Sequence, residues 1–159
     1  MIYEIFAIDR NNLFGNQNQL AWHYKEDLHY FKEKTLGKTC VMGEETFKSI
    51  VSRNGKPLPN RKSVIATLSD YTFGDVEVTH DIISWLNERR DKEDVYVIGG
   101  KAIINLTYKI ADVLYITYID ADHVGDVYLN LDLSGFDLVE ETQKGVLYFR
   151  KYVRSKWCF

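Results

Sequence analysis

The feature that most constrains the fold is the alternation of short apolar runs with helical segments along the chain. The runs are rich in β-branched and aromatic residues, which is typical of buried strands, and they occupy residues 2–8, 39–43, 63–67, 76–79, 95–98 and 113–119. Helical patterns lie between them at 25–36, 44–51, 81–90 and from 101 to about 109. Strands joined through helices form a parallel sheet that is covered on both faces. The sequence therefore predicts an α/β fold with a mostly parallel central sheet and helices on both sides.

The C-terminal part of the chain follows a different pattern. Residues 136–153 alternate around a break at Gln143-Lys144-Gly145, which predicts an antiparallel hairpin added to the sheet. Two other segments are predicted to be irregular: a long polar loop from Asp9 to Gln19, and a turn over 52–61 that holds both prolines. Without a repeat or a linker, the 159 residues are expected to form one domain.

Composition excludes several classes of function. A net charge of −3 gives no basic footprint for nucleic acid or an anionic membrane. Cys40 and Cys158 do not suggest a disulfide framework, and the four histidines lack metal-ligand spacing with them. The apolar start contains Glu4 and no cleavage site follows, and no run is long enough to span a membrane. We expect a cytoplasmic protein with no metal, no nucleic-acid partner and no membrane contact.

The predicted helix over 25–36 carries an acid on its apolar face. At 100° per residue, one face is shared by Tyr24, Asp27, Leu28, Phe31 and Thr35. Carboxylates are almost never buried without a partner. Two interpretations follow: Asp27 stays in water and serves the helix dipole, or it belongs to a site.

Two strand-to-helix turns are marked by glycine, namely Gly43 before Glu44 and the pair Gly99-Gly100 before Lys101. Ligands of open α/β sheets lie beyond the carboxyl ends of strands, where free N–H groups at helix starts suit phosphate. Neither turn is a complete phosphate-binding motif, so a glycine that merely permits a tight turn is an equal interpretation of each. Together they indicate a ligand that carries phosphate.

Two further polar residues have both a structural and a functional interpretation. Arg61 follows Pro57-Leu58-Pro59-Asn60 and precedes a strand; it is either a solvated charge or a bidentate grip on a carboxylate. Thr117 lies in an apolar strand, where threonine is usual for β-propensity, but its hydroxyl is also able to serve a buried acid.

A series of short motifs, in a fixed order, carries a family resemblance. They are Leu20-Ala21-Trp22, Glu26-Asp27-Leu28 with Phe31, Val41-Met42-Gly43 with Thr46-Phe47 and Ser49-Ile50, Pro57-Leu58-Pro59-Asn60-Arg61, Val97-Ile98-Gly99-Gly100, Leu114-Tyr115-Ile116-Thr117 with Ile119-Asp120, and Gly125-Asp126. In this order, and over nearly the whole chain, the series resembles bacterial-type dihydrofolate reductase.

The resemblance implies reduction of 7,8-dihydrofolate to tetrahydrofolate by hydride from NADPH, in a monomer that also binds antifolates. Asp27 matches the acid that holds the pterin, Thr117 supports it, and Trp22 orders a water that takes part in protonation of the pterin N5. Burial is expected to raise the pKa of Asp27. The loop from Asp9 to Tyr24 matches a mobile lid over the rings.

The resemblance also assigns the ligand contacts. Those to the substrate fall on Ile5, Ala7, Leu28, Phe31, Ile50, Leu58, Arg61 and Ile98, of which Arg61 matches the clamp on the glutamate carboxylate. Those to the cofactor fall on Ala7, Phe14, Gly15, Gly43, Thr46, Ser49, Thr67, Gly99 and Gly100. The Gly99–Gly100 peptide is expected to be cis.

The chain departs from the family pattern in the lid and at the cofactor phosphates. Ala21 and Lys25 replace prolines, which predicts a looser lid. Acidic Glu44-Glu45 replace basic residues, and Leu68 and Ala102 replace polar or basic ones, so NADH is a possible second cofactor. Two alternatives remain: the related reductase of riboflavin synthesis, and a binding protein that keeps the fold without turnover.

Overall fold

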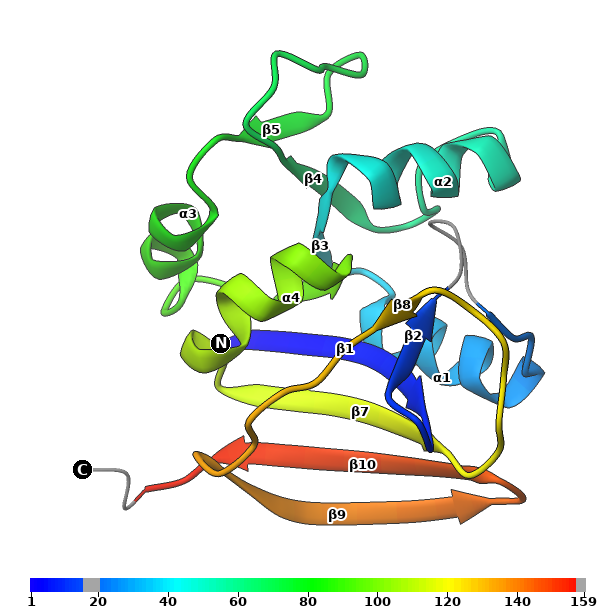
Figure 1. Ribbon diagram of the computed structural model, residues 1–159. Coiled ribbons are helices and arrows are strands. Elements are labelled where there is room, and N and C mark those ends of the chain that lie inside the picture. The colour runs from blue at the N-terminus through cyan, green and yellow to red at the C-terminus, as the bar shows by residue number, and fades with distance from the viewer. Residues whose placement is uncertain (16–20, 157–159) are drawn as a thin grey trace.

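The computed structural model describes residues 1–15 and 21–156, and within these ranges eight strands form one sheet (Figure 1). The strands are β1 Ile2–Asp9, β3 Thr39–Gly43, β4 Lys62–Ala66, β5 Glu77–Thr79, β6 Val95–Gly99, β7 Val113–Ile119, β9 Phe136–Lys144 and β10 Leu147–Arg154. Their order is β5-β4-β3-β6-β1-β7-β10-β9, from the top of Figure 1 to its bottom. The first five pairings are parallel and the last two antiparallel, which confirms the predicted fold class.

Four helices cover the sheet over the described residues: α1 Lys25–Thr35, α2 Glu44–Asn54, α3 Ile82–Arg89 and α4 Lys101–Thr107. Side chains of α3 and α4 join the core that contains Ile2, Val41 and Val97. Side chains of α1 and α2 pack on the other face, against Ile5 and Met42. This arrangement follows from the apolar strands, which alternate their side chains between two buried faces.

The structure corrects the predicted loop from Asp9 to Gln19. Leu13–Gly15 forms a short strand, β2, which pairs with Val127–Tyr128, β8, in a separate two-stranded sheet. A three-residue strand is too short to show a periodicity. Asp9 makes the turn between β1 and β2, since its buried carboxylate accepts from the backbone N–H groups of Asn11 and Leu13. Residues 16–20 lie outside the described residues, and so do Leu20 of the first motif and part of the predicted lid.

Two helix boundaries also differ from the prediction. Helix α2 continues to Asn54 and ends at Gly55, which has a φ of 76°, so the predicted turn over 52–61 begins later. Helix α4 ends at Thr107, and a 3-10 turn, Tyr108–Ile110, follows. Among the described residues no helix has the length and hydropathy needed to cross a membrane. Cys158 lies outside these residues, and Cys40 is a buried free thiol.

Candidate active site

Two cavities adjoin at the carboxyl ends of the parallel strands. The first encloses about 920 Å³ between α1, α2 and β1, and we call it the substrate cavity. The second encloses about 570 Å³ at the starts of α2 and α4, and we call it the cofactor cavity. They share Phe14, Thr46, Arg53 and Ile98. Ligands of α/β sheets are expected at this edge, so the two cavities form one continuous candidate site.

Asp27 lies in the first turn of α1 and lines the substrate cavity. Burial raises the pKa of this carboxyl above its usual value, and a hydrogen bond from the Thr117 hydroxyl lowers it by a smaller amount. Desolvation disfavours the charged form, whereas one hydroxyl donor favours it. Asp27 is therefore not simply a solvated acid at a helix start. It is a carboxyl that binds a proton more readily than a carboxyl in water.

Thr117 is fixed behind Asp27 by two neighbouring strands. It pairs with Ala7 of β1 and with Phe149 of β10, and only 2% of it is exposed. In this position its side chain lines the substrate cavity. Its hydroxyl donates to Asp27, so the threonine supplies a polar partner within an apolar strand as well as β-propensity.

Trp22 places an indole N–H in the same wall. The residue is 8% exposed, and its Nε1 is buried without a hydrogen-bond partner among the described residues. The ring packs at 5.1 Å, centroid to centroid, from His123, whose Nε2 lies 2.8 Å from the Tyr24 hydroxyl. A buried donor of this kind calls for water or a ligand as its acceptor, so the cavity fits a polar guest near Trp22.

The rest of the substrate cavity is mostly apolar, and the structure places all of the residues predicted to contact substrate along it. They are Ile5, Ala7, Leu28, Phe31, Ile50, Leu58, Arg61 and Ile98. Leu28 is 39% exposed although it lies on the apolar face of α1. An exposed leucine beside a cavity is typical of a wall that a ligand covers.

Arg61 is held at the edge of this cavity by neutral groups. Its Nε donates to the Pro59 carbonyl at 2.9 Å, and its Nη1 donates to the Thr35 hydroxyl at 3.1 Å. Thr35 in turn donates to the carbonyl of Phe31 at 2.8 Å. No ion pair joins Arg61 to an acid in residues 1–15 and 21–156. Its position is fixed while its charge stays available for an anionic ligand.

The cofactor cavity is built largely from backbone. Gly43, Gly99 and Gly100 line it beside the Thr46 hydroxyl, and the Gly99–Gly100 peptide is cis as expected. A Cβ on Gly43 would lie 3.2 Å from Ile103 Cγ1, and one on Gly100 would lie 3.3 Å from Thr46 Oγ1. Side chains there would fill the space in which a ligand meets the backbone. The glycines thus do more than permit a turn, and the cavity fits a dinucleotide with its phosphates at the start of α2.

The other residues predicted to contact the cofactor separate into two groups. Phe14 and Gly15 of β2 line the cofactor cavity opposite α2, and Ser49 and Thr67 line it from α2 and from the end of β4. Ala7 lines the substrate cavity alone. The prediction that Ala7 contacts both ligands is therefore matched by the lining of the substrate cavity alone.

Arg53 and Lys32 also line the site, and the sequence analysis did not select them. Arg53 lies on α2 four residues after Ser49, donates from its Nε to the Ser49 carbonyl at 3.4 Å, and lines both cavities. Lys32 of α1 lines the substrate cavity. The helical spacing of Arg53 from Thr46, Ser49 and Ile50 was the available signal. Both residues add positive charge near Arg61.

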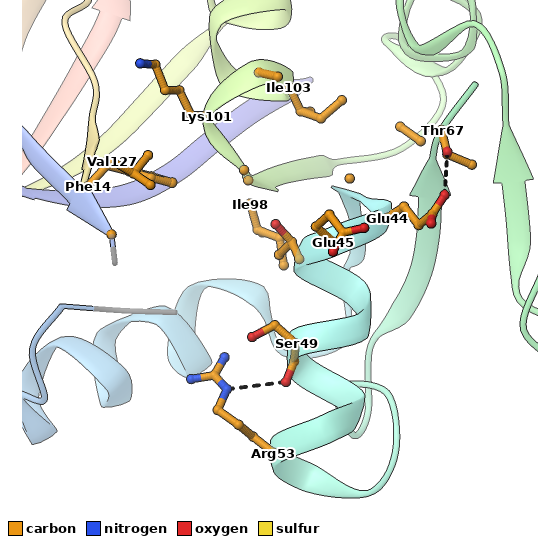
Figure 2. A pocket seen from close by; sticks show the side chains of 17 residues that line it. Phe14, Glu44, Glu45, Ser49, Arg53, Thr67, Ile98, Lys101, Ile103 and Val127 are labelled. Atoms are coloured by element: carbon orange, nitrogen blue, oxygen red, sulfur yellow. Dashed lines mark hydrogen bonds between the residues drawn. The ribbon is translucent and has the colours of Figure 1, made fainter. Parts of the chain in front are cut away.

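Glu44 lies at one end of the cofactor cavity, where Figure 2 shows its hydrogen bond with Thr67. Both of its carboxylate oxygens are bonded. Lys48 Nζ lies 2.6 Å from Oε2, while the hydroxyls of Ser69 and Thr67 donate to Oε1 at 2.5 and 2.8 Å. These three bonds, that of Lys48 first, lower the pKa of Glu44 to about 2. Glu44 is accordingly a permanent negative charge. No group of three or more His, Cys, Asp or Glu side chains within the described part of the chain could hold a metal ion.

Comparison with known proteins identifies the family to which this site belongs. Residues 1–152 match the family model described as dihydrofolate reductase. The dihydrofolate reductase of Bacillus subtilis (strain 168) is 39% identical over 145 residues, which cover 90% of this chain and 84% of the relative. Dihydrofolate reductase type 3 of Salmonella typhimurium is 40% identical over 129 residues, which cover 80% of this chain and 77% of the relative. A solved structure of dihydrofolate reductase from Enterococcus faecalis, complexed with NADP(H) and RAB-propyl, superposes with a TM-score of 0.86 at 31% identity and covers 98% and 97% of the two chains.

Proposed function

The chain belongs to the dihydrofolate reductase family and reduces 7,8-dihydrofolate to 5,6,7,8-tetrahydrofolate with NADPH, and we propose that Asp27 is the acid of this reaction. One observation carries the proposal: Asp27 is the carboxyl of the substrate cavity whose pKa burial raises, and a single hydroxyl supports it. The activity supplies tetrahydrofolate for one-carbon metabolism. The alternatives of a riboflavin-pathway reductase and of an inactive binding protein are set aside.

The junction of the two cavities is the place of hydride transfer. NADPH, when bound, supplies the hydride. Phe14 and Ile98 line both cavities, so they lie where the two reacting rings meet. Apolar side chains at this point exclude water and hold the rings in contact, which is the main contribution of a protein to such a reaction.

Asp27 orients the substrate and controls one proton. The two carboxyl oxygens accept hydrogen bonds from the amino-pyrimidine edge of the pterin, and Thr117 fixes the orientation of the carboxyl. Burial raises the pKa of this carboxyl, so it binds a proton more readily than an acid in water, and a water at the buried Trp22 indole N–H passes a proton on to N5. Trp22 and Thr117 therefore act with Asp27 in the protonation.

Arg61 binds the far end of the substrate. Dihydrofolate carries a glutamate tail, and the guanidinium of Arg61 has no acid partner in the described structure. We assign its remaining N–H groups to the tail carboxylate, since such pairs are the strongest hydrogen bonds of their class. Leu28, Phe31, Ile50 and Leu58 enclose the benzoyl ring between the tail and Asp27.

The cofactor cavity holds the dinucleotide. We assign the pyrophosphate to the backbone at Gly43, Gly99 and Gly100 with the Thr46 hydroxyl, and further contacts to Ser49, Thr67 and Gly15. We also propose that residues 1–159 form a single domain that works as a monomer in the cytoplasm and accepts antifolates in the substrate cavity. Light scattering on a sizing column tests the monomer, for which we expect a mass near 18.6 kDa.

The test of the proposed acid is Asp27→Asn, which keeps the size of the side chain and removes its titration. We expect kcat/KM for dihydrofolate at neutral pH to fall by roughly 10²–10⁴-fold, the usual contribution of a positioned acid. The matched control is Glu26→Gln, the exposed acid one position earlier on α1. Loss of nicotinamide absorbance gives the rate, and cofactor fluorescence reports that NADPH binding is unchanged. Activity of Asp27→Asn within a few-fold of wild type would reject the assignment.

A further inference from the structure

The cofactor cavity has two unlike ends. Figure 2 shows Phe14 and Val127 at one end and Glu44 with Thr67 at the other. Phe14 also lines the substrate cavity, so the end near Phe14 faces the pterin. Since the hydride must pass between the two rings, the nicotinamide half occupies that end. The adenosine half, with its ribose 2′ position, must then extend past the glycines toward Glu44 and Thr67.

The charges at the adenosine end are unusual for a site that receives a phosphate. Lys48 is the ammonium that contacts Glu44, and it is already paired with Glu44 at 2.6 Å and with Glu45 at 3.8 Å. Two carboxylates thus face one ammonium. The His80 imidazole also lies here, with its Nδ1 2.7 Å from the Thr67 carbonyl oxygen. Lys48 does not itself line the cavity; the lysine and arginine that do are Lys101 and Arg53, and Figure 2 shows both away from the Glu44–Thr67 pair.

The hydroxyls near the ribose are occupied as well. Thr67 and Ser69 both donate to Glu44 Oε1, and Thr67 Oγ1 accepts from the backbone N–H of Ser69 at 3.1 Å. A phosphate would have to take these donors from a carboxylate. A ribose hydroxyl, in contrast, needs an acceptor, and a carboxylate oxygen offers more than one lone pair.

Glu44 differs from its neighbour Glu45 in how it is held. The side chain of Glu44 is 18% exposed and bonded on both oxygens, whereas that of Glu45 is 66% exposed and makes one long ion pair. Acids at a helix start are favourable in water because of the helix dipole, and this accounts for Glu45. It does not account for Glu44, which is directed at the end of β4.

We propose that Glu44 determines cofactor specificity: its carboxylate accepts a hydrogen bond from a free ribose 2′-hydroxyl and disfavours a 2′-phosphate. The chain therefore uses NADPH with a small preference over NADH, or with none. This role of Glu44 rests on the proposed function, which assigns the cavity to the dinucleotide. It adds the group that Glu44 recognises, the ribose 2′-hydroxyl.

Calorimetry with two nucleotide fragments tests the recognition without turnover. Adenosine 2′,5′-bisphosphate carries the 2′-phosphate and adenosine 5′-monophosphate does not. We expect wild type to bind the two within about tenfold of each other. Removing one nearby negative charge should raise the affinity for a phosphate roughly tenfold or more at moderate ionic strength. Glu44→Gln should therefore shift the ratio of the two affinities by that factor toward the bisphosphate. Glu88→Gln, which removes an exposed acid from α3, is the charge control and should leave the ratio unchanged.

The ratio of the affinities for NADPH and NADH is measured by quenching of protein fluorescence. In Glu44→Gln this ratio should shift in the same direction as the ratio for the two fragments. A wild type that prefers the bisphosphate by more than about a hundredfold overturns the proposal, and this result needs no variant. A Glu44→Gln protein that is folded by circular dichroism and keeps the wild-type ratio within twofold overturns it as well. These results are independent of Asp27→Asn turnover, so the proposal on Glu44 fails separately from the proposed acid.

Discussion

The substrate cavity and the cofactor cavity adjoin, yet they are built from different parts of the chain. Apolar side chains of α1, α2 and β1 form the first, and glycine backbone at two helix starts forms much of the second. The substrate cavity contains one carboxyl in the first turn of a helix, Asp27 of α1, and the cofactor cavity contains two, Glu44 and its exposed neighbour Glu45 of α2. The pKa of Asp27 is raised by burial, while that of Glu44 is lowered to about 2 by Lys48, Ser69 and Thr67.

The contrast shows that position in a helix does not set the role of an acid. Both carboxyls meet the positive end of a helix dipole, which favours the charged form in each case. The neighbours decide the outcome. Apolar walls and one hydroxyl leave Asp27 able to bind a proton, whereas three donors keep Glu44 charged. One acid is suited to proton transfer and the other to recognition of a hydroxyl group.

Arg61 provides the first test of this difference between the two cavities, because it lines the substrate cavity alone. We expect Arg61→Leu to weaken dihydrofolate binding by roughly 1.5–3 kcal/mol, the range for hydrogen bonds to charged groups. A pterin without the glutamate should bind almost as well as to wild type, and NADPH affinity should not change. Fluorescence titration with each ligand measures the three effects. Equal losses for dihydrofolate and the shorter pterin would make Arg61 a structural residue.

Stability should change in opposite directions when each acid is neutralised. A raised pKa in the folded state costs stability at neutral pH, because the buried charge is disfavoured, and the cost disappears as pH falls below the unfolded value near 3.9. Asp27→Asn should therefore raise the free energy of unfolding at pH 7 by about 0.5–2 kcal/mol, and by nothing at pH 3.

For Glu44 the pKa shift contributes to the free energy of unfolding with the opposite sign. Its lowered pKa contributes stability above the unfolded value, and that contribution is lost as pH falls toward about 2. Glu44→Gln should therefore lower the free energy of unfolding at pH 7, and by less at pH 3. Urea unfolding of wild type and both variants at pH 7 and pH 3 measures these changes in the free energy of unfolding. A stabilised Glu44→Gln together with a destabilised Asp27→Asn would break the contrast.

Thr117→Val removes the one donor to Asp27 with little change of shape. The hydroxyl favours the charged form of the carboxyl, so its removal should raise the pKa of Asp27 further. Activity that depends on the Asp27 proton declines as pH rises through this pKa. The decline should therefore start at higher pH in the variant, and kcat/KM across pH 5–9 measures it. A shift to lower pH would mean that Thr117 does not donate to Asp27.

The sequence predicted the fold well where periodicity was long enough to read. The six apolar runs became the strands that carry the parallel pairings, and the alternation over 136–153 became β9 and β10. It did not predict β2 and β8, because these strands of three and two residues lie in largely polar segments and form by pairing with each other. The early end of α4 likewise has no marker such as glycine or proline.

The site was predicted less completely. The residues selected from the family motifs line the two cavities, with Ala7 limited to the substrate cavity. Arg53 was missed since most arginines on an exposed helix are solvated. Glu44 was recognised as a departure from the pattern, but its partners Thr67 and Ser69 lie 23 and 25 residues away. Contacts of that range are set by how β4 ends beside α2 and have no local pattern.

Titration of the two carboxyl groups tests the central claim most directly. Carbon-13 NMR of the Asp27 and Glu44 side-chain carboxyls, in the wild-type protein and over the pH range in which it stays folded, follows each proton at its own site. We expect Asp27 to titrate above 3.8, the ordinary value for aspartic acid, and Glu44 to remain charged down to about pH 2. A midpoint for Asp27 at or below 3.8 would contradict its role as the acid that holds a proton for dihydrofolate reduction.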